Sequence, residues 1–219
     1  MSTQTLSYYE VVSEMPDDMV EIFRDVSWEE YEELLEQVGE ASGLRISYDD
    51  GTMKVMTLST KHENYARFFE KLMAAISLRL RINIRSFGSA TMRKRRRRKG
   101  VEPDACFYVQ TADVIGNRIE LDFAVDPPPD IVLEVDVHHD SQDKFPIYAG
   151  LEVPEIWRYD GYEVIIHHLQ EDEYVEQEAS LALPMITARV LTDFMARFHN
   201  EGELQALLAF DEWIQSIAE

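Results

Sequence analysis

The pattern of apolar and polar residues predicts short strands gathered in the middle of the chain, with helices on either side. Apolar residues recur at helical spacing over 27–39, 60–80, 187–198 and 203–217. Short apolar or alternating runs predict strands over 44–48, 53–58, 105–109, 131–137, 155–159, 162–169 and 174–177. We therefore expect an α+β fold, a mixed β-sheet flanked by helices, with an N-terminal helix and β-hairpin.

Cap and turn residues fix several of these boundaries. Ser27 and Glu30 form a capping box at the start of one helix, and Thr60 and Glu63 predict a second capping box. Asp-Gly pairs at 50–51 and 160–161 predict hairpin turns. Residues 82–92 and the basic run that follows are predicted to be extended, and 140–151 to form a short helix.

We expect one domain over residues 27–200. Residues 1–26 lack clear periodicity and are predicted to be an arm or short helix, and 201–219 a C-terminal helix packed on the same domain. A chain of 219 residues with 45% hydrophobic and 29% charged residues suits a globular protein with a large core. The absence of a secretory signal, of a membrane-length apolar run and of a second cysteine predicts a cytoplasmic protein.

The net charge of -21 is unevenly distributed. Residues 93–99 (RKRRRRK) hold seven of the 21 lysines and arginines, so a local partner of this run need not match the acidic average. Its natural partner is a nucleic-acid backbone, and the candidate contacts are Arg93, Arg95, Arg96, Arg97 and Arg98. The alternatives are a solvated hairpin, or one that pairs with the acidic surface of another subunit.

Two carboxylates and one amine are the candidates for chemistry. Asp104 opens one predicted strand, and Glu134 lies on the more polar face of another, together with Asp136. Lys144 and Tyr148 share one face of the next helix, which can fold back over these acids. If the two strands are neighbours, the set suits metal-assisted phosphodiester hydrolysis. The alternative is a structural ion pair between Glu134 and Lys144.

The segments around these candidate residues resemble those of a known family. Residues 102–108 (EPDACFY), 129–135 (PDIVLEV) and 153–157 (VPEIW), with Lys144 and Tyr148, are similar to the Uma-type restriction endonucleases of the PD-(D/E)XK nuclease superfamily. The resemblance implies a restriction-endonuclease-like core, with Asp104, Glu134 and the carbonyl of Val135 as Mg²⁺ ligands.

The resemblance also implies that Lys144 is the catalytic lysine. The superfamily pattern places a lysine two residues after the acid, where this chain has Asp136, so Lys144 takes that role and Asp136 could add a metal ligand. His62, at the start of a helix, could contact a phosphate or a metal-bound water, with a capping role as the alternative. Glu63 is an accessory candidate, since an acid on such a helix joins the metal site in some relatives. Tyr148 is a second accessory candidate.

The sequence therefore predicts a homodimeric endonuclease that depends on Mg²⁺, or on Mn²⁺, and acts on DNA. One alternative is a nucleic-acid-binding or regulatory module that keeps the fold without turnover, which Asp136 at the usual lysine position favours. The other is an interaction protein whose basic strip docks on acidic protein. The motifs GxxxxGK[ST], GxGxxG, GxSxG and HExxH are absent, so nothing supports nucleotide-driven, dinucleotide-dependent, hydrolase-elbow or zincin chemistry.

Overall fold

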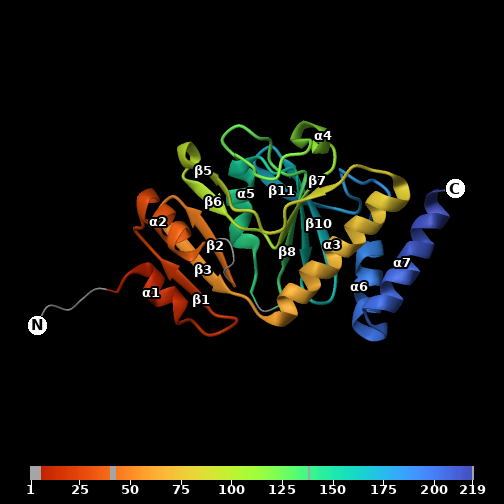
Figure 1. The fold of residues 1–219 in the computed structure, drawn as a ribbon, viewed down its shortest axis with the longest axis horizontal. Coiled ribbons are helices and arrows are strands. Elements are labelled where there is room, and N and C mark those ends of the chain that lie inside the picture. Colours follow the sequence, from red (N-terminus) through yellow and green to blue (C-terminus); the bar gives the residue numbers. More distant parts are fainter. Residues whose placement is uncertain (1–5, 40–42, 138, 219) are drawn as a thin grey trace, which may run out of the picture.

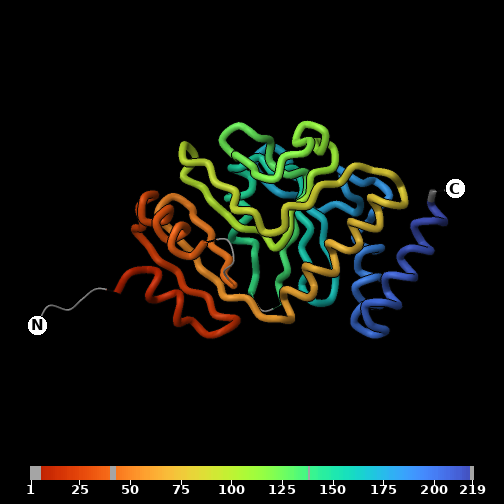
Figure 2. Tube along the Cα trace, in the orientation of Figure 1, coloured from red at the N-terminus to blue at the C-terminus, as the bar shows by residue number. Residues whose placement is uncertain are grey.

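Two β-sheets form the body of the protein, seen in a computed structural model that describes residues 6–39, 43–137 and 139–218. In Figure 1 the N-terminal elements and the two C-terminal helices lie on opposite sides of the larger sheet. The tube in Figure 2 shows the same separation of the N-terminal elements from the C-terminal helices. Within the described ranges, no helix has the length and apolar character needed to cross a bilayer.

The smaller sheet is antiparallel throughout and has the order β1-β3-β2-β6-β5. Its strands are β1 (Val20–Phe23), β2 (Leu44–Asp49), β3 (Thr52–Thr57), β5 (Met92–Lys94) and β6 (Lys99–Val101). Helices α1 (Tyr8–Ser13) and α2 (Trp28–Val38) supply its apolar cover, in which Trp28 and Tyr31 pack against Tyr48. The capping box predicted at Ser27 and Glu30 is confirmed.

The larger sheet is mixed and has the order β11-β10-β9-β8-β7-β4. Its strands are β4 (Arg85–Ser86), β7 (Ala105–Tyr108), β8 (Ile131–Val135), β9 (Glu155–Tyr159), β10 (Val164–Gln170) and β11 (Glu173–Gln177). Strands β8 and β9 are parallel and their neighbours pair antiparallel. A mixed sheet flanked by helices confirms the predicted α+β class.

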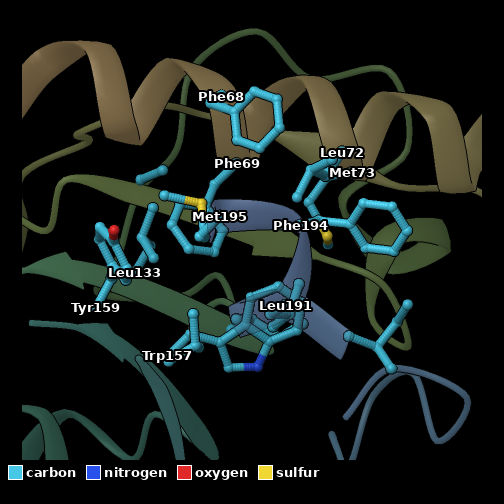
Figure 3. Packing of buried hydrophobic residues seen from close by; sticks show 14 of the residues in the cluster. Phe68, Phe69, Leu72, Met73, Leu133, Trp157, Tyr159, Leu191, Phe194 and Met195 are labelled. Carbon is cyan, nitrogen blue, oxygen red and sulfur yellow. The ribbon is translucent and has the colours of Figure 1, made fainter. Parts of the chain in front are cut away.

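Alternation along the central strands divides the buried residues between the two faces of this sheet. Leu133 packs with α3 (Thr60–Leu80), α6 (Ala188–Glu201) and α7 (Glu203–Ala218), whereas Val132 packs with α5 (Phe145–Leu151). Figure 3 shows the first face, where α3 and α6 meet the sheet. Trp157 and Tyr159 are buried there as part of the core.

Three local predictions need correction. The segment predicted as an arm or short helix contains α1 and also strand β1, which pairs with β3; residues 1–5 of that segment, and residue 219, lie outside the described residues. The N-cap of α3 is Ser59, one residue before the predicted capping box, because the Ser59 hydroxyl accepts from the His62 amide. The basic run is not extended: β5 and β6 are joined by the 3₁₀ turn η1 (Arg95–Arg97) and by Arg98 at φ 49°.

Cys106 is fully buried in β7, and burial raises the pKa of its thiol to about 12. At pH 8 only about 10⁻⁴ of such a thiol is ionised, and the thiolate is the reactive form. We therefore expect Ellman's reagent to leave the native protein unmodified and to modify one thiol per chain in denaturant. Rapid modification of the native protein would show that β7 is more accessible than its packing indicates.

Candidate active site

The two acids predicted to act together lie at one edge of the larger sheet. Strands β7 and β8 are antiparallel neighbours with Ala105 opposite Leu133, and the Asp104 amide donates to the Leu133 carbonyl at 3.0 Å. Asp104 therefore lies just before β7, across from Glu134 near the end of β8. The predicted adjacency of these strands is confirmed.

Glu134 is held by two side chains from the segment that follows β8. Lys144 ends the 3₁₀ turn η2 (Gln142–Lys144), and its ammonium donates to Glu134 Oε2 at 2.7 Å. The Tyr148 hydroxyl, one helical turn later on α5, donates to Glu134 Oε1. Only 1% of Glu134 and 5% of Lys144 are exposed, so the ion pair is buried. The contact is common to the catalytic and the structural interpretations of the sequence.

Asp104 is in contact with groups from three different elements of the fold. Its Oδ2 accepts from the Val135 amide at 2.8 Å and lies 3.1 Å from His62 Nε2, in the first turn of α3. Its Oδ1 accepts from Arg45 Nε, on β2, at 3.2 Å. The larger sheet, the smaller sheet and α3 therefore meet at this carboxylate.

Arg45 was missed by the sequence analysis. It is a buried guanidinium that links Asp104 to Glu63, whose Oε1 accepts from Arg45 Nη2 at 3.0 Å. The only signal in the sequence is a single cation inside the strand-like run 44–48, because a buried arginine requires an acidic partner. The contact also places Glu63 beside the site.

The pKa values show how the charges at this site balance. Burial alone would raise the pKa of Asp104, but His62, Lys144 and Arg45 outweigh burial and lower it. Burial raises the pKa of Glu134 to about 7, despite the opposing charge of Lys144. Burial would lower the pKa values of His62 and Lys144, yet the nearby carboxylates raise both. Lys144 is therefore a cation at neutral pH and not a free base.

A model of the Uma2 family, described as "putative restriction endonuclease", matches residues 28–197. The chain belongs to the Uma2 family. No curated protein matches the chain. Among solved structures, a chain described as a putative nuclease belonging to DUF820 from Anabaena variabilis ATCC 29413 is 16% identical, with a TM-score of 0.45. The match covers 68% of this chain and 90% of that one.

In this Uma2 chain, Asp136, two residues after Glu134, binds the turn that carries Lys144. Asp136 Oδ2 accepts from the Ser141 amide and hydroxyl, each at 3.1 Å, and from Arg158 Nη1 at 3.2 Å. The Asp136 side chain is nearly buried, so these contacts fasten both ends of the segment between β8 and η2. An additional role of Asp136 as a metal ligand stays a prediction.

The donor chemistry of the site fits a hard divalent cation. In the described part of the chain, no three His, Cys, Asp or Glu side chains form a ready-made metal cluster. Mg²⁺ does not require one, because it is commonly bound by one or two carboxylates and keeps several waters. Asp104 and Glu134 come from neighbouring strands and supply carboxylate oxygens, which are the ligands that Mg²⁺ prefers.

The basic run that was predicted to contact DNA is paired with acids of the same chain. Arg95 contacts Glu29 and Glu32 on α2, and Arg93 lies 4.0 Å from Glu32. Further ion pairs join Lys94 and Arg97 to Glu152, Arg98 to Asp50, and Lys99 to Asp49. Arg96 is exposed on η1. The role of these arginines in DNA binding stays a prediction.

Proposed function

We propose that the protein is a divalent-metal-dependent endonuclease that hydrolyses DNA phosphodiester bonds. The observation that carries this proposal is the buried arrangement of Asp104, Glu134 and Lys144 at the meeting point of the two sheets. Family membership supports a nuclease, since the Uma2 family is described as putative restriction endonucleases. Mg²⁺ is the proposed ion, with Mn²⁺ as an alternative.

The residues that would hold the ion are Asp104, Glu134 and the carbonyl of Val135. A bound divalent ion would polarise a phosphoryl oxygen and lower the pKa of a bound water. His62 and Arg45 orient Asp104, and Tyr148 orients Glu134. Because Lys144 stays protonated, its role is to stabilise negative charge that develops at phosphorus, and not to abstract a proton.

We further propose a homodimer. One site hydrolyses one strand, so two copies of the site provide the simplest means of cutting both strands of a duplex. An analytical ultracentrifugation run on the full chain measures this state directly, and a monomer at working concentrations would reject this part of the proposal.

The test of the function is a cleavage assay on supercoiled plasmid with the wild-type protein. We expect nicked and linear products with Mg²⁺ or Mn²⁺ and intact plasmid with EDTA, because the two carboxylates alone cannot activate water. Cleavage that persists in EDTA would overturn the metal requirement. DNA binding without cleavage in either metal would favour the binding module, and the absence of both would favour the protein-interaction alternative.

A further inference from the structure

A polar cleft lies at the N-terminal end of α3 and shares Arg45 with the candidate active site. Its volume is about 1030 Å³, and its lining includes Arg45, Ser59, Lys61, Glu63, Asn64 and Arg67. Lys61, Asn64 and Arg67 follow each other at three-residue spacing along α3, so they share one side of the helix. The cleft is therefore a feature of α3 and of the neighbouring start of β2.

Arg45 connects this cleft with the candidate active site. The same side chain lines the cleft, donates to Asp104 and borders a small pocket that Glu134 and Lys144 also line. Glu63, which accepts from Arg45, lies in the cleft as well. A ligand in the cleft thus lies next to the group that neutralises Asp104.

The charge of the cleft differs from that of the chain as a whole. Its lining has three cations, Arg45, Lys61 and Arg67, and one carboxylate, Glu63, whereas the net charge of the chain is -21. Arg67 contacts Glu70 at 3.0 Å and Glu63 at 3.9 Å, and Lys61 is exposed. Hydroxyl and amide groups of Ser59, Thr60 and Asn64 complete a surface suited to a phosphate backbone.

The basic run at 93–99 is a weaker candidate for the strand that is cut. Most of its cations lie within 4.0 Å of a carboxylate of the same chain, but Arg45 and Arg67 of the cleft do so as well, so the difference between the two surfaces is their position. Its turn also lies beyond the Asp49 end of β2, because β6 pairs with β2 over Ser47–Asp49. At about 3.3 Å per strand residue, Asp49 is ~13 Å from Arg45.

We propose that this cleft binds the sugar-phosphate backbone of the nucleic-acid strand to be cut, an inference that rests on the proposed endonuclease function. Lys61 and Arg67 contact phosphates along the strand, and Arg45 is next to the phosphate that reaches Asp104 and Glu134. The ligand class is a polyanionic phosphodiester, recognised through its backbone and not through its bases.

The test compares charge-removing variants in a binding assay without turnover. Fluorescein-labelled duplex DNA is titrated in EDTA with the wild type, with Lys61→Gln/Arg67→Gln, and with Arg95→Gln/Arg97→Gln from the basic run. The control is Arg189→Gln/Arg197→Gln, which removes two exposed cations from α6. We expect the cleft variant to raise Kd about tenfold and to reduce the salt slope of log Kd by about 2, since each phosphate contact contributes about 0.9.

Three results would overturn the cleft assignment: no DNA binding by the wild type, an unchanged Kd in the cleft variant, or a larger loss in the basic-run variant than in the cleft variant. The two levels of the proposal are separable. If the wild type binds DNA but does not cut it with Mg²⁺ or Mn²⁺, a weakened cleft variant still supports the binding surface. If the wild type cuts and the cleft variant binds and cuts normally, the endonuclease proposal stands and the cleft assignment fails.

Discussion

Glu134→Gln is expected to lower the rate of Mg²⁺-dependent DNA cleavage at least ~100-fold, since loss of even an outer-shell partner of a metal ligand costs 10–100-fold. The glutamine keeps the shape of the side chain and an acceptor for the Tyr148 hydroxyl, but it removes the negative charge. Plasmid cleavage under single-turnover conditions measures the effect. The circular dichroism spectrum and the thermal transition report whether the fold persists.

Asp130→Asn is the matched control for this change. Asp130 is a buried carboxylate just before β8 that accepts from the Val109 and Thr111 amides, so the control removes a charge from the same segment without touching the site. We expect Asp130→Asn to keep most of the cleavage activity. Equal loss in both variants, or full activity of Glu134→Gln, would remove Glu134 from the proposed mechanism.

Lys144→Met is expected to lower the free energy of unfolding by about 3–5 kcal/mol, because it leaves the buried Glu134 without its ion-pair partner. In this variant Glu134 can also become protonated, because burial already raises its pKa. Protonation removes the unpaired charge, so we expect a loss near the lower end of that range. Urea denaturation at neutral pH measures the change.

Two further variants isolate the contribution of the pair. Lys54 Nζ lies 2.6 Å from Oδ2 of Asp143, whose side chain is half exposed. Lys54→Met should therefore lower the free energy of unfolding by no more than about 1 kcal/mol. The double variant Glu134→Gln/Lys144→Met should be more stable than Lys144→Met, since removing both charges removes the unpaired one. A Lys144→Met variant as stable as the wild type would show that the ammonium is not buried against Glu134.

Local sequence patterns were sufficient to predict that Glu134, Lys144 and Tyr148 lie together. Alternation placed Glu134 on the polar face of its strand, and the spacing of Lys144 and Tyr148 placed both on one helix face; both side chains contact Glu134 in the structure. The pairing of the strands that carry Asp104 and Glu134 was a condition of the prediction and not a consequence of these patterns, and the structure confirms it.

The rest of the site depends on how the two sheets meet, which no local pattern encodes. Arg45 lies on a strand of the smaller sheet, 59 residues from Asp104, and reaches it only because the sheets join at this edge. The shape of the basic run was missed for a related reason. The prediction gave it an extended backbone throughout, whereas pairing of β5 with β6 requires a tight reversal through η1 and Arg98.

Helix α3 has consequences for how a ligand can enter. Its first turn contributes His62 and borders the cleft. Further along, Phe68, Phe69, Leu72 and Ile76 are buried in the core cluster that α3 shares with the larger sheet, α6 and α7. Moving one end of a continuous helix would pull those aromatic and aliphatic groups out of close contact, at a cost of several kcal/mol. We therefore expect the cleft at the start of α3 to be rigid and preformed, with the same backbone before and after a ligand binds.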